Sequence, residues 1–442
     1  MKIKFLGAIE DVTGSMTLVE NNNQKFLIDS GMYQGVLHIV KKNVRPLAFD
    51  PHEIKAIVLT HGHLDHSGYI PRLVKLGFRG DIFCTRETMK LARIVMTDSA
   101  RILEENEHHP LHAFYGPEDI LKATSFFKVK PLKEEFDLAG LKIHFQSAGH
   151  ILGASSVVVK QEEKQGEKTI VFSGDLGRAN DPLMFPPDDC PPADVLMMES
   201  TYGGTIRKGD IEQELIQFLK KIKNESRIGI IASFAVARSQ LLITLISEHY
   251  KAHPEDRVRF VIDGPMMLEA NKVYVEYAHE TKLPEELKQA LRFVETLQHQ
   301  REWESLQKKD GPLIILSSSG MVAGGRIWRH LENWQDDDTA VLFLPGYQSE
   351  GTPGRALSMG RREIQDEEGK RIKWRGEVMT SSAFSSHADQ NELLAWLKNV
   401  PKESTIYLNH GEPEAKEAFR EKLTAMGWKH VKVPHVLTEV EI

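Results

Sequence analysis

Residues 59–68, "LTHGHLDHSG", place four side chains of metal-ligand type directly after an apolar run. Imidazoles and carboxylates are the usual ligands of zinc and similar ions, and catalytic sites combine several of them with room for water. At a spacing of two in an extended segment, His61 and His63 point the same way and can bind one ion. Asp65 and His66 then lie close enough to hold a second. A surface turn with incidental histidines is the alternative, but this density of ligands favours a metal site.

Composition excludes several classes of protein. The chain has 442 residues, 41% apolar and 27% charged, as is ordinary for a soluble globular protein of two or three domains. No apolar run approaches the roughly 20 residues that span a bilayer, and the N-terminus does not resemble a signal peptide. Cys84 and Cys190 are too few for a disulfide framework. We therefore expect a cytoplasmic protein without membrane association.

Net charge argues against a broad nucleic-acid-binding surface. The formal charge is −7, whereas nucleic-acid-binding domains usually carry a basic footprint. Any binding of RNA or DNA must therefore use a local basic stripe. Its affinity would fall only shallowly with salt, because few phosphate contacts are made.

The pattern of apolar runs divides the chain into three parts. Up to about residue 203, short strands end in polar loops, as in "KFLIDSG" and "TIVFSGDLG". Residues 204–385 alternate strand and helix, which predicts a parallel sheet covered by helices. From residue 386, Asp389 and Glu392 are spaced as a helix capping box, and "STIYLNHGEP" is again a strand that ends in a loop with a histidine. We therefore predict a first domain at 1–203, an insertion at 204–385, and a return to the first domain at 386–442.

Three further candidate ligands lie at predicted strand ends beside glycines. They are His150 in "SAGHILGA", Asp175 in "SGDLG" and His410 in "LNHGE". Glycine lets the backbone turn tightly and brings a side chain into a crowded site. Each of these residues alone is more often an ordinary loop residue. Together with the 59–68 stretch, they predict the remaining ligands of a two-metal site.

These motifs resemble those of a known superfamily. "THGHLDHSG", "SAGHILGA", "SGDLG" and "ESTYG" resemble the metallo-β-lactamase superfamily. The later "SSSGMVAGGR", "GYQSEGTPGR", "SSAFSSHADQ" and "LNHGE" resemble its β-CASP branch of nucleic-acid-processing nucleases. The likeness is closest to bacterial and archaeal relatives of the endonuclease subunit of the cleavage and polyadenylation specificity factor. It implies an α/β chain in which a four-layer αββα fold carries an inserted, Rossmann-like β-CASP domain with a parallel sheet.

The resemblance also implies a role for each motif residue. It implies one zinc ion held by His61, His63 and His150, a second held by Asp65, His66 and His410, and Asp175 bridging the two. Asp29 in "LIDSG" matches the aspartate that braces the metal loop as a hydrogen-bond acceptor. Glu199 matches the carboxylate that orients a histidine, here His387. That histidine contacts the scissile phosphate or protonates the leaving oxygen.

The chemistry of such a site suits phosphodiester hydrolysis. Two zinc ions about 3.5–4 Å apart can share a hydroxide and clamp the attacking and leaving oxygens. Zinc lowers the pKa of bound water to about 7, so no separate strong base is needed. An imidazole with a pKa near 6.5 can protonate the leaving oxygen. We expect a ribonuclease that cuts internal bonds and leaves 5′-phosphate and 3′-hydroxyl ends, with 5′-exonuclease action left open.

Candidate substrate contacts lie in the predicted insertion. "SSSGMVAGGR" follows an apolar strand and precedes a helix, so its amides can cradle a phosphate. It lacks the Lys-Ser/Thr ending of a P-loop, which argues against nucleotide hydrolysis. With the family resemblance, Ser318, Gly320 and Arg326 become candidates for binding the nucleic-acid backbone, and Arg355 in "GYQSEGTPGR" joins them.

Alternative functions remain open at this point. In the family, a histidine at the last motif is typical of RNA enzymes and a valine of DNA-repair members, so His410 favours single-stranded RNA over DNA. A small-molecule metallohydrolase is disfavoured by the insertion. A non-catalytic subunit is disfavoured because all seven ligand positions are kept. A homodimer formed through the C-terminal part is compatible with the family, although no residue points to it.

A second histidine-rich stretch, "ENEHHPLH", looks like another metal cluster. It contains His108, His109 and His112 around Pro110, between two segments with helical spacing. A proline inside such a stretch favours a loop. We predict that these histidines have structural rather than metal-binding roles.

Overall fold

The chain folds into two compact units. The computed structural model describes residues 1–107, 109–164, 166–297, 302–303, 306, 311–366 and 369–442. The first unit comprises residues 1–34, 38–206 and 386–442, and the second comprises residues 35–37 and 207–385. The chain therefore leaves the first unit after its first two hundred residues and returns to it near the C-terminus.

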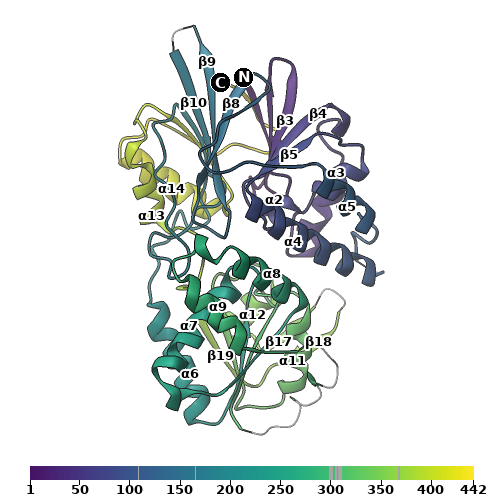
Figure 1. The fold of residues 1–442 in the computed structure, drawn as a ribbon, viewed down its shortest axis with the longest axis vertical. Helices are drawn as coiled ribbons and strands as arrows, with labels where there is room; N and C mark the ends of the chain where they lie inside the picture. Colours follow the sequence, from purple (N-terminus) through teal and green to yellow (C-terminus); the bar gives the residue numbers. More distant parts are fainter. Residues whose placement is uncertain (108, 165, 298–301, 304–305, 307–310, 367–368) are drawn as a thin grey trace. The chain divides into compact units, whose positions relative to one another are not determined.

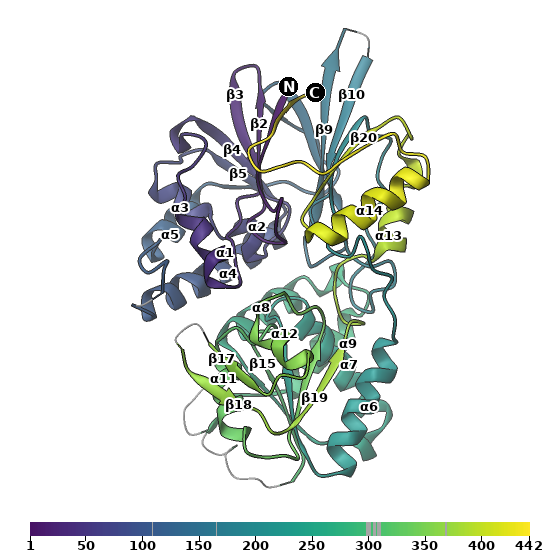
Figure 2. The same cartoon turned by 180° about the vertical axis from the view of Figure 1, so that it is seen from behind.

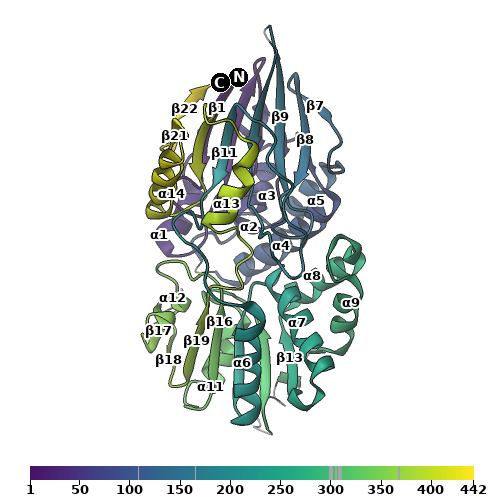
Figure 3. The same cartoon turned by 90° about the vertical axis from the view of Figure 1, so that its left-hand side faces the viewer.

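The first unit contains two mixed β-sheets. In one, the strands lie in the order β22-β1-β2-β3-β4-β5-β6. Their bounds are β1 Lys2–Gly7, β2 Met16–Asn21, β3 Gln24–Ile28, β4 Ile54–Val58, β5 Asp81–Cys84, β6 Phe127–Val129 and β22 Glu439–Glu441. Strands β3 to β6 run parallel, and β22 pairs antiparallel with β1. This pairing explains why the two termini lie side by side in Figure 3.

The second sheet of this unit is built from both sides of the insertion. Its order is β21-β20-β11-β10-β9-β8-β7. The bounds are β7 Phe136–Leu138, β8 Leu141–Ser147, β9 Ser155–Glu163, β10 Gly166–Phe172, β11 Val195–Glu199, β20 Thr405–Asn409 and β21 His430–Lys432. β11, which precedes the second unit in sequence, pairs in parallel with β20, which follows it. The register places Glu199 opposite Asn409.

Strand alternation creates the layers of the first unit. In β4, Ala56 and Val58 face the second sheet, whereas Ile57 faces the helices on the other side. Figure 1 shows α2 to α5 beside the first sheet and α13 and α14 beside the second. The bounds are α2 Leu64–Ser67, α3 Ile70–Lys75, α4 Arg86–Glu105, α5 Pro117–Ser125, α13 Gln390–Trp396 and α14 Pro413–Ala425. The predicted four-layer αββα arrangement is confirmed, as is the capping box that begins α13 at Asp389.

The second unit is built around a parallel sheet. Its order is β14-β13-β15-β12-β16-β19, and every pairing in it is parallel. The bounds are β12 Ile228–Ala232, β13 Arg259–Asp263, β14 Glu295–Thr296, β15 Leu313–Ser317, β16 Val341–Pro345 and β19 Glu377–Ser381. A separate hairpin joins β17 Glu363–Gln365 to β18 Arg371–Lys373. The predicted parallel-sheet insertion is therefore confirmed.

Helices cover both faces of that sheet. Phe218 of α6 packs where Gly229 of β12 leaves room, and Ile228 and Ile230 face the opposite side, where Leu331 of α11 packs. Figure 2 shows α6 and α11 on opposite sides of the strands. The bounds are α6 Ile211–Asn224, α7 Arg238–Ala252, α8 Pro265–Glu276, α9 Pro284–Phe293, α11 Arg326–Trp334 and α12 Pro353–Ser358.

The other helical segments with both ends in the described part of the chain are short. They are α1 Leu37–Val40 and the 3-10 turns Lys41–Val44, Pro51–Glu53, Pro254–Asp256, Ala278–Glu280 and Leu397–Asn399. Among the described residues, no helix combines the length and the apolar character needed to cross a bilayer.

The apolar layer between the two sheets should dominate the stability of the first unit. Phe145 of β8 is fully buried in this layer. We expect Phe145→Ala to lower the free energy of unfolding by about 3–5 kcal/mol, because it removes a buried ring and leaves a cavity. Denaturant titration followed by circular dichroism measures the change. Leu121→Ala is the control: Leu121 is 75% exposed, so its replacement should change stability by less than about 0.5 kcal/mol.

Candidate metal centre

The first ligand cluster consists of His61, His63 and His150. These residues come from two loops of the first unit. His61 and His63 follow β4, and His150 follows β8. The Nδ1 atom of His63 lies 3.1 Å from His61 Nε2 and 3.3 Å from His150 Nε2. A β-carbon at Gly62 would lie 2.9 Å from the backbone nitrogen of Ala92 in α4, so this loop needs glycine there to pass so close to the helix. Three ring nitrogens thus converge on one point.

The second ligand cluster, Asp65, His66 and His410, combines the short helix α2 with the loop after β20. The two Nε2 atoms of His66 and His410 lie 3.2 Å apart. Asp65 Oδ2 lies 3.6 Å from His410 Nε2. Helix α2 therefore contributes two ligands on consecutive residues, and the returning chain contributes the third.

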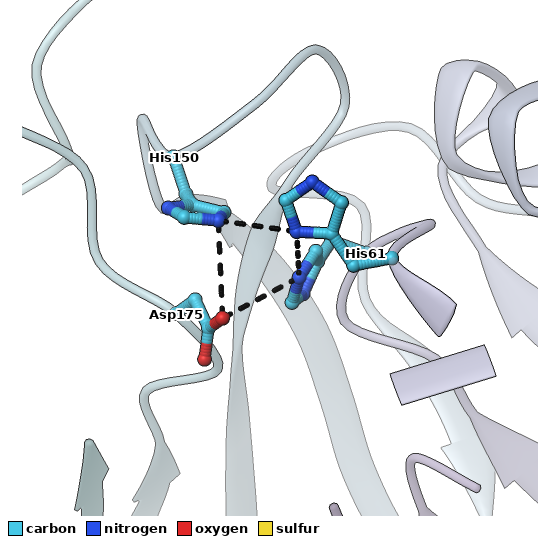
Figure 4. Close-up of side chains that lie close together, drawn as sticks. His61, His150 and Asp175 are labelled. Carbon is cyan, nitrogen blue, oxygen red and sulfur yellow. Dashed lines mark hydrogen bonds and ion pairs between the residues drawn. The ribbon is translucent and has the colours of Figure 1, made fainter. Parts of the chain in front are cut away.

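Asp175, in the loop after β10, lies between the two clusters. Its Oδ2 is 3.5 Å from His61 Nε2 and 3.8 Å from His150 Nε2, as the dashed lines in Figure 4 indicate. Its Oδ1 is 3.3 Å from His66 Nε2 and 3.4 Å from His410 Nδ1. Each carboxylate oxygen therefore faces a different ligand cluster.

The electrostatics of the centre keep the first cluster neutral and Asp175 ionised. Burial lowers the pKa of His61 and His150 well below the ordinary value, and it lowers the pKa of His63 to about 4. Burial opposes ionisation of Asp175, but the imidazoles around it outweigh this effect and hold its pKa well below the usual range. Neutral imidazoles and ionised carboxylates are the forms that bind a metal ion.

The positions of the ligand atoms fit divalent metal ions. Within each cluster, and with Asp175 added to the first, the ligand atoms all lie within 4.8 Å of one another. Ligands 2.0–2.1 Å from a tetrahedral zinc ion lie roughly 3.3 Å apart. The nitrogen separations of 3.1 Å and 3.3 Å in the first cluster are close to that value. The donor set of imidazoles and carboxylates is also the one that zinc prefers.

Asp29 braces the metal loop through Thr60. Its Oδ1 accepts a hydrogen bond from the Thr60 amide at 2.8 Å, and its Oδ2 accepts one from Thr60 Oγ1 at 2.9 Å. The same Oδ2 lies 2.7 Å from His66 Nδ1. Burial lowers the pKa of His66, but Asp175 and Asp29 outweigh it and raise that pKa well above its usual value. Asp29 therefore fixes which ring nitrogen of His66 faces the cluster centre.

Glu199 and His387 form a pair beside the ligand clusters. Glu199 is fully buried, and its Oε1 lies 3.2 Å from His387 Nδ1 and accepts a hydrogen bond from the Leu176 amide. The His387 ring lies 4.5 Å from that of His150, measured between centroids. Burial lowers the pKa of His387, but the Glu199 carboxylate outweighs it, so the pKa lies above its ordinary value.

Two threonines were missed by the sequence analysis. Thr60 Oγ1 lies 3.1 Å from His61 Nδ1, in addition to its bonds with Asp29. Thr201 Oγ1 lies 3.1 Å from His410 Nδ1 and donates to the His410 carbonyl at 3.1 Å. Both threonines lie within the quoted motifs, directly before "HGH" and within "ESTYG". Their position beside a ligand or a catalytic carboxylate was the signal that could have identified them.

Most residues of the centre are buried, and three of them are partly exposed. His61, His66, His150, Asp175, Glu199 and His410 are buried. The side chains of Asp65 and His387 are each 20% exposed, and His63 is partly exposed. Solvent therefore has access to the centre at these three residues.

The predicted backbone-binding residues all lie in the second unit. Ser318 and Gly320 follow β15, Arg326 begins α11, and Arg355 lies exposed in α12. Gly320 is buried. Arg326 Nη1 donates to the buried carboxylate of Asp263 at 2.5 Å, which leaves its other nitrogens for a ligand.

In the second histidine-rich stretch, the two described histidines hydrogen-bond to nearby backbone groups. His112 Nδ1 lies 3.0 Å from the Leu103 carbonyl, and His109 Nδ1 accepts a hydrogen bond from the Leu111 amide. His108 lies outside the described residues. The metal-ligand groups found among the described residues include neither His109 nor His112.

Comparison with known families assigns three segments of the chain. Residues 9–224 match the metallo-β-lactamase superfamily, and residues 239–357 match the β-CASP domain. Residues 371–434 match the Zn-dependent metallo-hydrolase RNA specificity domain. The seven ligand residues lie within the first and third of these segments.

Several proteins are similar over nearly the whole chain. A ribonuclease of Thermus thermophilus is 34% identical, covering 97% of this chain and 95% of its own length. An RNase J-like protein of Methanocaldococcus jannaschii is 30% identical, with 98% and 96% coverage. A protein of unknown function from Enterococcus faecalis is 12% identical, with a TM-score of 0.57 over 99% of both chains, and so shares the fold. The chain belongs to the β-CASP branch of the metallo-β-lactamase superfamily.

Proposed function

We propose that the protein is a zinc-dependent ribonuclease that hydrolyses phosphodiester bonds of single-stranded RNA. The observation that carries this proposal is the placement of the two Asp175 oxygens between two ligand clusters, with the Glu199–His387 pair at the open edge. The similar Thermus thermophilus and Methanocaldococcus jannaschii proteins are named as a ribonuclease and an RNase J-like protein. The match to an RNA specificity domain supports the same substrate.

The proposal includes two zinc ions. His61, His63 and His150 would hold one, Asp65, His66 and His410 would hold the other, and Asp175 would bind both. When bound, the ions supply a nucleophile from water near neutral pH and neutralise charge on the phosphodiester. The protein's own part is to orient the imidazoles, as Asp29 and Thr60 do for the metal loop, while burial keeps the imidazoles of the first cluster neutral.

His387 is proposed as the donor of a proton to the leaving oxygen. The Glu199 carboxylate contacts Nδ1 of His387, and we propose that a substrate meets this ring through Nε2. The same carboxylate favours the protonated imidazole, and a proton donor must be protonated before the reaction. The 20% exposure of the His387 side chain allows this contact with a substrate.

The choice of RNA over other substrates has specific support. His410 belongs to the second ligand cluster, as in the RNA-processing members that the sequence resembles. Ser318, Gly320, Arg326 and Arg355 are proposed to bind the RNA backbone.

Two free buried thiols, Cys84 and Cys190, suit the reducing cytoplasm in which we place the protein. A homodimer is the assembly to test first by sedimentation.

The decisive experiment combines metal analysis with cleavage assays. Purified protein should contain about two zinc ions per chain and should cut a 5′-labelled RNA internally. The products should carry 5′-phosphate and 3′-hydroxyl ends. A DNA of the same sequence is the comparison substrate. Faster cleavage of DNA, or RNA cleavage that survives complete removal of metal by chelators, would contradict the proposal.

Replacing the bridging carboxylate should empty both metal sites. In Asp175→Asn the side chain keeps its size but loses the negative charge that faces both clusters. We expect the zinc content to fall from about two ions per chain toward zero and cleavage to fall at least 100-fold. Elemental analysis of gel-filtered protein measures the first effect. Asp189→Asn is the control, because Asp189 pairs with Lys398 at the surface. Two zinc ions retained by Asp175→Asn would contradict the bridging role.

The Glu199–His387 pair should set the alkaline limb of the pH–rate profile. His387 acts in its protonated form, so the rate is maintained below its pKa and falls as pH rises through that pKa. Because Glu199 raises this pKa, Glu199→Gln should move the limb to lower pH. His387→Ala should lose the limb and slow cleavage by about 100-fold or more while keeping its zinc. Loss of zinc from folded His387→Ala would instead identify His387 as a ligand.

A further inference from the structure

A tight loop at the N-terminus lies against the second ligand cluster. This loop, residues 8–15, connects β1 to β2 and closes on itself. A β-carbon at Gly7 would lie 1.8 Å from the Gly14 carbonyl oxygen, so the loop ends approach as closely as only glycine allows. Gly14 itself has a φ of +78° and packs on the ring of Tyr33. The path of the 8–15 loop is therefore restricted at both ends.

The backbone of this loop bonds to two residues of the second cluster. The Ala8 carbonyl accepts a hydrogen bond from the His410 amide at 2.7 Å. At the other end, the Ser15 amide donates to the Asp65 carbonyl at 2.8 Å. His410 and Asp65 are far apart in sequence, and the 8–15 loop bridges their main chains. No comparable main-chain bridge to this loop is found for the first cluster among the described residues.

The backbone of His410 needs this support. His410 has a φ of +46° and Ala8 a φ of +53°, both in the left-handed region that residues other than glycine rarely adopt. Such a conformation costs on the order of 1 kcal/mol or more and persists only when neighbouring contacts hold it. The Ala8–His410 bond and the Ser200 amide, which donates to the His410 carbonyl at 3.1 Å, are such contacts.

One buried lysine anchors the 8–15 loop. Lys416, the fourth residue of α14, is 1% exposed, and its ammonium donates to the Ile9 carbonyl. Burial lowers its pKa to about 8, while the nearby carboxylates of Glu10 and Asp11 partly offset the effect. A cation near the N-terminal end of a helix is also disfavoured by the helix dipole. Burial and the position in the helix both disfavour a charged lysine at residue 416. The contact of Lys416 with the 8–15 loop explains why a lysine is found there.

The helix that carries Lys416, α14, is itself held in place. A β-carbon at Gly203 would lie 2.8 Å from the Ala415 carbonyl and 2.7 Å from the Phe419 side chain, so α14 packs directly on the turn that follows β11. Gly203 lies close to Ser200 and Thr201, which bond to His410. Lys416 therefore joins the 8–15 loop to a helix that is already held beside the same ligand.

We propose that Lys416 is a positioning residue for the second ligand cluster: it holds the 8–15 loop, which in turn holds the main chains of His410 and Asp65. This inference rests on the proposed two-zinc centre. It assigns no contact between Lys416 and either metal ion. Loss of Lys416 should therefore weaken zinc binding at the second cluster only, because the 8–15 loop supports that cluster and the ligands of the first cluster are held by other contacts.

The test compares zinc affinities of the two sites in Lys416→Met. Metal-free protein is titrated with zinc against a chelating dye, and the two dissociation constants are fitted. We expect the second zinc to bind about 10–100-fold more weakly, with the affinity of the first unchanged. Lys398→Met is the matched control, because Lys398 is 57% exposed and pairs with Asp189 at the surface. In a His410→Ala background, which removes the second site, Lys416→Met should leave the affinity of the remaining zinc unchanged.

The outcomes separate this inference from the proposed function. Wild-type protein that binds fewer than two zinc ions would defeat the two-zinc centre, whatever Lys416 does. Wild-type affinity for both ions in Lys416→Met, or equal weakening of both in a folded variant, would overturn the role of Lys416 alone. If Lys416→Met does not fold, Lys42→Met decides the question. Lys42 bonds to Asp11 of the same loop at 2.6 Å, so its loss should weaken the second site selectively, and unchanged affinity would overturn the inference.

Discussion

The centre depends on one buried carboxylate that faces positive or electron-donating groups on both sides. Asp175 is buried, and desolvation alone would favour its neutral form. The surrounding imidazoles reverse that preference and keep it ionised. For His61 and His150, in contrast, burial has the larger effect and keeps the imidazoles neutral. An ionised Asp175 beside the neutral imidazoles of His61 and His150 is ready to bind cations, and a protonated Asp175 would be unable to link the two clusters.

Parallel strands explain how the sequence motifs come together. β10, β11 and β20 are parallel neighbours, so the loops that follow them leave the same edge of one sheet. Asp175 and His410 lie in the loops after β10 and β20, and Glu199 is the last residue of β11. Because apolar runs mark the strand ends clearly, they predicted the insertion with its parallel sheet and the candidate ligands Asp175 and His410 at this edge. The four layers of the fold and the place of Glu199 were expected from the resemblance to the family. Strand ends are local features, and a local pattern is sufficient to predict them.

Contacts made through main-chain atoms or single hydroxyls could not be predicted in this way. Thr60 and Thr201 support ligands through one oxygen atom each, and their side chains carry no spacing rule. The role of Lys416 depends on a carbonyl some four hundred residues away in sequence, at Ile9. Arg326 was predicted from its motif to bind phosphate. The buried Asp263 that holds its guanidinium ends a different strand, β13, and comes close to Arg326 only when the parallel sheet is formed.

The order of the motifs along the chain has a physical consequence for the centre. Glu199 precedes the second unit, whereas His387 and His410 follow it, so the centre is complete only after the returning strand β20 has paired with β11. Closing a loop of about 200 residues costs roughly 5 kcal/mol of chain entropy, but each doubling of its length adds only about 0.6 kcal/mol. The length of the second unit therefore has little effect on the stability of the centre. The pairing at the two ends of the second unit is what the centre requires, because the register of β11 and β20 places Glu199 opposite Asn409, the residue before His410.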